Sequence, residues 1–419
     1  MRILFLNDLH DPRIGSSIRQ MYQQAARLAQ LGHEAEILST TTDPAQVGQQ
    51  EILGVPVTRL LSDYNPRWRA WVGLDNPRVK QGVAETLERF CPDVVHAHLI
   101  HTHLSYASLT RARESGAGVV FTAHDVMTFC YQKLTCFHGG EAAGGLLRDY
   151  EARLSKCLPC QRLRLRPGRN AAIAKILQRD VHRLTVVSDE LGRALKANQI
   201  RVDCTVHNAI SVQSKLPEAG AVAAFRAERG LEGKLIVAIG GRLHEQKGMR
   251  QLLKMLALLA PDFPSLRLLV MGKAEIYQQE FEPLARELGV AERVVATGWL
   301  DGLQLQQALA ASDIFVTPSI CLDTFGMVNL EAMEHSKPVV ATVFGGSSEV
   351  VQAGVTGAVA NPFDVPAFAA ELAKLLRDPV LRRAQGRAGR QRLLDHFGIE
   401  RLTTEFLKVY GQAMGAAGR

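Results

Sequence analysis

The chain has 419 residues, 47% of them hydrophobic and 22% charged, with a formal net charge of +7 at pH 7. This length exceeds what one hydrophobic core usually serves, so we expect two domains. No apolar run approaches the roughly 20 residues of a membrane span, and the apolar stretch at the N-terminus is too short for a signal peptide, which favours a cytoplasmic protein.

The first half alternates short apolar runs with segments of helical period. An amphipathic helix is predicted from Ile18 onward, and Gly32 is its expected stop signal. The apolar runs predict strands at residues 2–7, 34–40, 55–60, 93–98, 118–124, 184–188 and 204–208. Strands separated by helix-length segments indicate βαβ units and a parallel sheet.

The same alternation restarts after residues 211–223, which lack periodicity and are the expected linker. Strands are predicted at residues 234–242, 266–272, 293–298, 313–319, 337–342 and 357–360, with helices between them. The tail, residues 379–410, is predicted to be helical with a break near His396. The fold class is therefore α/β, with two doubly wound units and ligand-binding loops at the carboxyl ends of the strands.

One such loop is IGGRLHEQKG at residues 239–248. Gly241 lets the backbone approach a ligand, and the helix after this loop offers free N–H groups and a positive dipole end. Arg242 and Lys247 add two cations, which completes a set of groups suited to a diphosphate. An ordinary glycine turn with surface charges is the alternative. No P-loop pattern indicates NTP hydrolysis.

A second loop places two carboxylates on either side of a glycine turn. Asp323 lies before the turn, and Glu331 is expected on the second turn of the helix that follows. A carboxylate can accept hydrogen bonds from a pair of sugar hydroxyls, so we expect Asp323 to hold a hexose and Glu331 a ribose. The backbone N–H groups expected to meet phosphate oxygens are those of Thr324, Phe325 and Gly326.

The order D-x-F-G-x4-E-A-M, followed by K-P-V-V, resembles the E-x7-E signature of retaining GT-B glycosyltransferases of the family 4 type. Arg242 and Lys247 match the donor-phosphate motif of that family. The runs FGGSSE at residues 344–349 and VHN at residues 206–208 resemble its G-G-x-x-E and inter-domain segments. Asp323 stands where the family has Glu, and its carboxylate reaches about 1.5 Å less far, so the donor is not assigned.

The resemblance implies a GT-B fold, in which two Rossmann-like domains face a cleft and a C-terminal helix crosses back. The implied domains are an acceptor-side domain at residues 1–210, a nucleotide-sugar-binding domain at 211–395, and a C-terminal helix at 396–419 that packs toward the first domain. Gly15 and Ser16 match an acceptor-side glycine-rich loop of the family.

His124 matches a family histidine that lies near the donor sugar and helps to hold it. Four further histidines, His96, His98, His101 and His103, precede it. Two of them alternate on a predicted strand whereas His101 is expected to start a helix. We therefore expect one or two of them to face the cleft and no dedicated metal site.

The implied reaction transfers a sugar from a nucleotide diphosphate donor to an acceptor hydroxyl with retention of configuration and without a required cofactor. The implied catalytic residues are His124, Asp323, Arg242 and Lys247. The implied donor-binding residues are Gly15, Ser16, Gly241, Arg242, Lys247, Thr324, Phe325, Gly326 and Glu331. The acceptor would be a sugar or a lipid-linked sugar in bacterial polysaccharide or glycolipid synthesis.

Two alternatives share this fold and donor site, namely a nucleotide-sugar epimerase and a non-catalytic nucleotide-sugar-binding protein. A glycoside hydrolase also uses paired carboxylates, but the phosphate loop would then be superfluous.

Four of the seven cysteines fall in an insertion at about residues 128–165, spaced C-x5-C and C-x2-C. Two cysteine pairs can hold zinc tetrahedrally, and a bound metal would stabilise the fold of this glycine-rich segment. An iron–sulfur cluster and four ordinary thiols are the alternatives. The expected ligands are Cys130, Cys136, Cys157 and Cys160, and His138 is a further candidate ligand.

The run after the cysteines is the most basic of the chain. Its cations are Arg162, Arg164, Arg166, Arg169, Lys175, Arg179 and Arg183. A solvated helix face is the commoner explanation, and a patch for anionic lipid on the inner membrane face is the alternative. No basic residues interleave with aromatic ones, so nucleic acid is not an expected partner.

Overall fold

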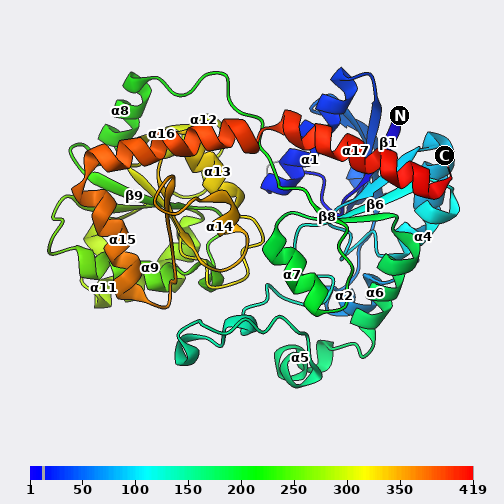
Figure 1. Ribbon diagram of the computed structural model, residues 1–419, viewed down its shortest axis with the longest axis horizontal. Coiled ribbons are helices and arrows are strands. Elements are labelled where there is room, and N and C mark those ends of the chain that lie inside the picture. The colour runs from blue at the N-terminus through cyan, green and yellow to red at the C-terminus, as the bar shows by residue number, and fades with distance from the viewer. Residues whose placement is uncertain (12–14, 419) are drawn as a thin grey trace. The chain divides into compact units, whose positions relative to one another are not determined.

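The computed structural model describes residues 1–11 and 15–418, and the chain divides into two compact units (Figure 1). Unit 1 consists of Met1–Leu134, Asp149–Ser211 and Ile399–Arg419, and unit 2 consists of Thr135–Arg148 and Val212–Gly398. One boundary differs from expectation. Residues 135–148, expected within the first domain, fold with unit 2, because their aromatic side chains pack against that unit.

Unit 1 is built on an eight-stranded sheet in the order β3-β4-β2-β1-β5-β6-β7-β8. All neighbouring strands are parallel except β3 and β4, which form an antiparallel hairpin. The strands are β1 (Arg2–Leu6), β2 (Glu34–Thr41), β3 (Gly48–Ile52), β4 (Val55–Leu61), β5 (Val94–Ala97), β6 (Gly118–Ala123), β7 (Arg183–Val186) and β8 (Cys204–Thr205).

The sequence predicted every strand of this sheet except β3. That strand reads GQQEI, with a single strongly apolar residue, so it carries no strand pattern of its own. It forms because Leu53 and Gly54, both with positive φ, make a tight turn that returns the chain antiparallel to β4.

The helices of unit 1 are α1 (Ser16–Gln30), α2 (Arg69–Val72), α3 (Lys80–Phe90), α4 (Ala107–Glu114), α5 (Leu154–Gln161), α6 (Arg169–Asp180), α7 (Asp189–Ala197) and α17 (Ile399–Ala417). Helices α1 and α17 pack side by side on one face of the sheet (Figure 1). The amide Nε2 of Gln24 on α1 donates to the hydroxyl of Tyr410 on α17 at 3.0 Å. The two ends of the chain therefore share one core.

Unit 2 has a parallel six-stranded sheet in the order β11-β10-β9-β12-β13-β14. Its strands are β9 (Leu235–Gly240), β10 (Leu266–Met271), β11 (Val294–Ala296), β12 (Ile314–Thr317), β13 (Val339–Thr342) and β14 (Gly357–Ala360), all at predicted positions. The chain runs outward from β9 to β11 and then returns to β12 on the other side of β9. Strands β9 and β12 therefore flank the topological switch point, where open α/β sheets bind ligands.

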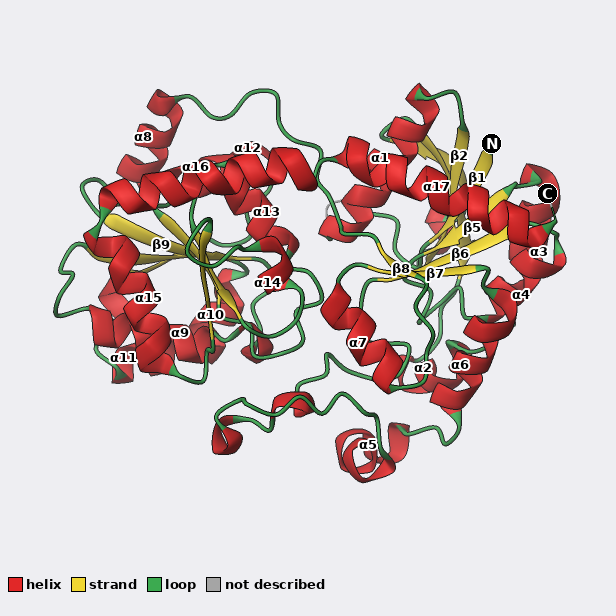
Figure 2. Cartoon of the chain, viewed as in Figure 1, coloured by secondary structure: helices red, strands yellow, loops and turns green. Residues whose placement is uncertain are grey.

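The helices of unit 2 are α8 (Ala219–Glu228), α9 (Met249–Leu259), α10 (Ala274–Glu280), α11 (Glu282–Glu287), α12 (Gly302–Ala311), α13 (Met327–Glu334), α14 (Ser347–Val350), α15 (Val365–Arg377) and α16 (Pro379–His396). Figure 2 shows α9, α11 and α15 on one face of the sheet and α12, α13 and α16 on the other. The expectation of an unstructured linker to residue 223 was wrong, because α8 begins at Ala219. This helix buries only Phe225, so its sequence shows little periodicity.

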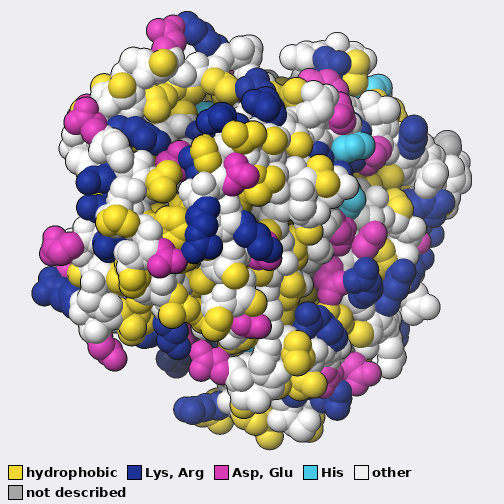
Figure 3. Space-filling view, turned by 60° about the vertical axis from the view of Figure 1, so that its left-hand side comes forward, with side chains coloured by type: hydrophobic (Ala, Val, Ile, Leu, Met, Phe, Trp, Pro, Cys, Tyr) yellow, Lys and Arg dark blue, Asp and Glu magenta, His cyan; other side chains and the backbone are white. Residues whose placement is uncertain are grey.

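One face of the protein shows how its surface charges are distributed. On the face drawn in Figure 3, basic and acidic side chains are interspersed. Within residues 1–11 and 15–418, every helix is too short or too polar to span a lipid bilayer.

Candidate functional site

Two loops meet at the switch point of unit 2. The loop after β9 ends in a 3-10 turn, Glu245–Lys247, from which α9 follows. The N–H of Ile320, in the loop after β12, donates to the carbonyl of Gln246 at 2.9 Å. Gly248 has φ +73°, and a Cβ at this position would collide with the carbonyl oxygen of Pro318. Glycine therefore permits the close approach of the two loops.

A charged pair lies between these loops. Lys247 Nζ donates to Asp323 Oδ2 at 2.9 Å, and Ser319 Oγ donates to the same oxygen at 3.0 Å. Burial alone would lower the pKa of Lys247. Asp323, with a smaller contribution from Cys321, more than offsets this and holds the pKa above its ordinary value. Lys247 is therefore a fixed cation at neutral pH, with 29% of its side chain exposed.

The backbone of Asp323 is held by the loop after β13. Asp323 forms a parallel bridge with Gly345, and its carbonyl accepts from the N–H of Gly346 at 2.8 Å. Gly345 has φ +89°, and a Cβ there would collide with the carbonyl of Asp323. The two glycines of the G-G-x-x-E segment thus support Asp323 through the backbone.

Helix α13 begins beside the glycine loop. Gly326 caps the N-terminus of this helix in a left-handed conformation. The Cγ1 atom of Val328 lies 4.0 Å from where a Cβ at Gly241 would be. Glu331 follows Val328 by three residues and so lies on the same helix face. Glu331 and the glycine loop therefore belong to one surface of unit 2.

Two other predicted residues of unit 2 differ in their surroundings. Arg242 is exposed in the glycine loop. Phe325 is 1% exposed, and its ring packs edge to face against that of Phe397 with centroids 5.9 Å apart. The side chain of Phe325 therefore stabilises the core, which leaves only its backbone for a ligand.

The sheet of unit 1 has its own switch point, between β1 and β5. Asp8, just after β1, is 5% exposed and accepts hydrogen bonds from the N–H groups of Thr102, His103 and Leu104 at 2.7, 3.0 and 2.7 Å. Burial raises the pKa of Asp8, against the opposing effect of these donors. Asp8 was not singled out from the sequence, although a polar residue directly after a strand was the available signal.

His124 follows β6 and pairs with His98, which follows β5. His124 Nε2 and His98 Nδ1 are 2.7 Å apart, so one nitrogen donates and the other accepts. The ring of His96 lies beside that of His98, with centroids 4.1 Å apart. Burial lowers the pKa of His124 to about 4, with Asp125 acting in the opposite direction. The expected helix at His101 was wrong, because α4 begins only at Ala107.

We expect His124→Gln to weaken the pH dependence of stability on the acid side. Because the pKa of His124 is about 4 when folded and about 6.5 when unfolded, the unfolded chain binds its proton first. The contribution of neutral His124 is complete above about pH 6.5 and is lost as pH falls toward about 4. Urea unfolding at pH 7 and pH 5 should show a smaller loss of unfolding free energy in the variant. The exposed His396→Gln is the control, and parallel losses in His124→Gln and wild type would contradict the prediction.

Comparison with known families decides the identity. Residues 222–392 match the family profile described as "Glycosyl transferases group 1", and residues 15–209 match the "Glycosyl transferase 4-like domain". The chain belongs to the GT-B glycosyltransferases of the family 4 type.

Known relatives of this glycosyltransferase act on different substrates. The GDP-mannose-dependent alpha-(1-6)-phosphatidylinositol monomannoside mannosyltransferase of Mycolicibacterium smegmatis is 34% identical over 187 residues, which are 43% of this chain and 49% of that protein. The glycogen synthase of Mycobacterium tuberculosis is 26% identical over 433 residues, covering 98% of this chain and 94% of that protein.

Solved structures show the same fold. Sucrose-phosphate synthase from Thermosynechococcus elongatus has a TM-score of 0.77 at 20% identity, covering 99% of this chain and 100% of the other. HepE of Anabaena, solved in complex with UDP, has a TM-score of 0.73 at 18% identity, covering 98% and 100%. The two parallel-sheet units are thus those of a GT-B enzyme.

The predicted residues of the glycosyltransferase divide between the two units. Unit 2 contains Gly241, Arg242 and Lys247 in the loop after β9, Asp323, Thr324, Phe325 and Gly326 in the loop after β12, and Glu331 on α13. Unit 1 contains His124, Gly15 as the N-cap of α1, and Ser16 as the first residue of that helix. Sequence reasoning missed Ser319, which no pattern singles out because its role depends on where Asp323 folds.

The four cysteines of the insertion are divided in the same way. Cys136 belongs to unit 2 and the other three belong to unit 1. Among the residues that the structure describes, no three His, Cys, Asp or Glu side chains form a group that could hold a metal ion. The geometry therefore gives no support to a zinc or iron–sulfur site at these thiols, and metal binding stays a prediction.

Some cations of the basic run, residues 162–183, do not lie on the surface of the protein. Arg169 is buried, with its guanidinium 4.6 Å from the centroid of the Tyr131 ring, and it donates to the carbonyl of Met127 at 2.6 Å. Arg166 is half-buried and donates to the carbonyl of Ala70 at 3.4 Å. Treating these two cations as one face with the others was wrong, because they satisfy carbonyl groups inside unit 1.

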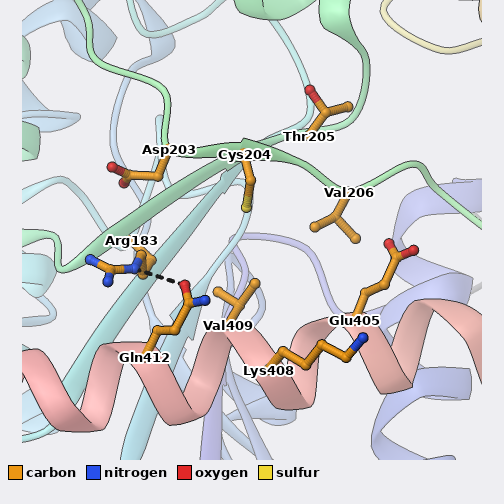
Figure 4. Close-up of a pocket in the computed structure, with 9 residues that line it drawn as sticks. All are labelled: Arg183, Asp203, Cys204, Thr205, Val206, Glu405, Lys408, Val409 and Gln412. Carbon is orange, nitrogen blue, oxygen red and sulfur yellow. Dashed lines mark hydrogen bonds between the residues drawn. The ribbon is translucent and has the colours of Figure 1, made fainter.

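A shallow cavity of about 550 Å³ lies between β8 and α17 in unit 1 (Figure 4). Arg183 Nε donates across it to Gln412 Oε1 at 3.1 Å. Its other lining residues are Asp203, Cys204, Thr205, Val206, Glu405, Lys408 and Val409. None of the predicted site residues lines this cavity, and its charged groups are balanced in sign.

Proposed function

We propose that the protein transfers a sugar from a nucleotide diphosphate-sugar to an acceptor hydroxyl. The main support for this proposal is the ion pair at the switch point of unit 2, in which Asp323 keeps Lys247 positively charged. The departing diphosphate gains negative charge, which a preorganised cation and the N-terminus of α9 stabilise. HepE was solved with UDP and one relative is named GDP-mannose-dependent, so UDP-sugars and GDP-sugars are the first donors to test.

The other residues of this surface take complementary roles in the proposal. Arg242 supplies a second cation for the diphosphate, and Glu331 accepts hydrogen bonds from the ribose hydroxyls. Asp323 orients Lys247, since its Oδ2 accepts from that side chain and from Ser319. Holding a hexose hydroxyl is a further role for the Asp323 carboxylate.

We further propose that the transferred sugar keeps its anomeric configuration, as the family resemblance implies. The acceptor oxygen attacks the anomeric carbon on the face from which the diphosphate departs. The bond from that carbon to the diphosphate oxygen breaks as the bond to the acceptor oxygen forms. The acceptor proton passes to the departing phosphate oxygen, so no protein nucleophile is needed.

The test is a screen of purified protein with UDP-sugars and GDP-sugars and with sugar or polyprenyl-linked acceptors. Acceptor-dependent release of nucleoside diphosphate, with a product whose anomeric proton shows the donor's configuration by NMR, supports the proposal. Interconversion of donors without an acceptor would identify an epimerase instead. Tight donor binding without turnover under any condition would identify a binding protein.

We also propose a peripheral contact with anionic lipid, in keeping with a lipid-linked acceptor in polysaccharide or glycolipid synthesis. Leu154 and Leu158 share one face of α5 and are 66% and 51% exposed, and Leu163 is 98% exposed. Arg162 and Arg164 flank this leucine and are exposed as well. Exposed leucines beside cations suit the interface between headgroups and acyl chains.

The double variant Arg162→Glu/Arg164→Glu should bind phosphatidylglycerol-containing vesicles at least tenfold more weakly than wild type, because each cation near an anionic surface contributes about 1 kcal/mol. Vesicle sedimentation over a range of lipid concentrations measures the effect. Lys215→Glu changes a side chain that is 79% exposed in unit 2 and is the matched control. Equal binding by wild type and the double variant would contradict the lipid contact.

A further inference from the structure

A short segment of the first half of the chain belongs to unit 2. Thr135–Arg148 folds there, although the chain on both sides of it folds with unit 1. Phe137 is fully buried, with its ring centroid 5.5 Å from that of Phe344. His138 is 3% exposed and stacks on Phe344 at 5.0 Å. The segment is therefore an integral part of the core of unit 2.

The far end of the segment is anchored to the same surface. The guanidinium of Arg148 lies 5.2 Å from the centroid of the Phe344 ring. The amide Nδ2 of Asn361 donates to the carbonyl of Gly144 at 2.7 Å. Because both ends hold to residues that follow β13 and β14, the segment has a defined position against unit 2.

His138 makes two hydrogen bonds that specify its tautomer. Its Nε2 lies 2.6 Å from the carbonyl oxygen of Ile320, so Nε2 must carry the proton. Its Nδ1 accepts from the N–H of Gly140 at 2.9 Å. Burial lowers the pKa of His138, partly opposed by the bond to Ile320, which favours the neutral ring that this pattern requires.

Ile320 connects His138 to the charged pair. Its carbonyl accepts from His138, and its N–H donates to Gln246 in the turn that carries Lys247. A second connection runs through the aromatic contact, since Phe344 precedes Gly345, the bridge partner of Asp323. His138 is therefore linked to Lys247 through Ile320 and to Asp323 through Phe344 and Gly345.

We propose that His138 is a positioning residue for donor binding, which holds the loops carrying Lys247 and Asp323 through the carbonyl of Ile320. The inference rests on the proposed function of unit 2, because those loops are assigned to the diphosphate. The segment Thr135–Arg148 then belongs to the donor-binding half of the enzyme, and replacement of His138 alters donor affinity although His138 does not contact the donor.

The test compares His138→Phe, which keeps a packing ring but loses both hydrogen bonds, with His138→Gln, whose amide can again donate to Ile320. Glu141→Ala is the matched control, because this residue lies in the same segment and its exposed side chain pairs with Lys254 at 3.8 Å. Hydrogen–deuterium exchange of residues 243–248 and 318–326 reports the loops directly. Calorimetric titration with UDP and with GDP reports donor binding, and thermal unfolding confirms that each variant folds.

His138→Phe should accelerate exchange in both loop peptides and weaken nucleotide binding by about fivefold, since one hydrogen bond is lost at the loop. Exchange in β10 should not change. His138→Gln should recover part of both effects, and Glu141→Ala should behave as wild type. Unchanged loop exchange in folded His138→Phe, or equal effects from Glu141→Ala, would overturn the inference.

Failure of the proposed function would give a different set of results from failure of the positioning role. Wild-type protein would then bind neither UDP nor GDP, whereas the exchange data would still show whether His138 holds the loops. Faster loop exchange together with unchanged nucleotide affinity would overturn the positioning role while leaving the donor site in place.

Discussion

Lys247→Ala is expected to lower the rate of sugar transfer by roughly 10²–10³-fold, the usual cost of removing one group that stabilises developing negative charge. Lys247 is the cation that Asp323 and Ser319 hold in place, and its charge is maintained through neutral pH. The loss should appear mainly in kcat, because the diphosphate gains charge as it departs. Steady-state release of nucleoside diphosphate, with the donor found in the screen, measures it.

The variant also removes the lysine that pairs with Asp323. The carboxylate of Asp323 is 10% exposed, and in the variant its Oδ2 loses the bond from Lys247 and keeps the bond from Ser319. Loss of the charge partner of a buried carboxylate can destabilise the fold, so unfolding should be followed alongside activity. Lys374→Ala is the matched control, because it removes a lysine of unit 2 whose side chain is 62% exposed and lies on α15. Near-normal turnover by Lys247→Ala in folded protein would remove the basis of the proposed mechanism.

Glu331→Ala is expected to lower kcat/KM for the donor by about 100-fold. Two hydroxyl-to-carboxylate hydrogen bonds would be lost, and bonds to a charged group contribute about 1.5–3 kcal/mol each. The loss should appear mainly in KM, because the ribose is bound equally before and during transfer. This division between KM and kcat distinguishes Glu331 from Lys247.

Glu371→Ala, on α15, is the control for Glu331→Ala, because its side chain is 33% exposed and pairs with Lys374. Glu331→Gln should fall between alanine and wild type, since an amide oxygen still accepts a hydrogen bond without the charge. If Glu331→Ala kept a near-normal kcat/KM and Lys247→Ala kept a near-normal kcat, the assignment of the donor site to this surface of unit 2 would be wrong.

Much of the fold could be predicted from local patterns. Strands of a parallel sheet are buried on both faces and read as continuous apolar runs, as in β9 and β12. Two elements that were not predicted from the sequence have few apolar residues in a regular pattern. The strand β3 has one strongly apolar residue, and α8 buries only Phe225, so neither carries a clear period.

The candidate site was predictable to a smaller extent. Glycine turns after strands pointed to Lys247 and Asp323, but not to their mutual contact. The pair joins residues 76 positions apart, which meet only because β9 and β12 are neighbours in the sheet. The same reasoning applies to Asp8, whose three backbone donors come from residues 102–104.

The sequence by itself determined the order of most strands and helices and singled out the two loops proposed to bind the donor, because burial patterns and glycine turns act over a few residues. Only the tertiary structure decided which loops share a surface, that His98 pairs with His124, and that Thr135–Arg148 folds with unit 2. These outcomes depend on side-chain contacts between segments far apart along the chain, and no local pattern encodes such contacts.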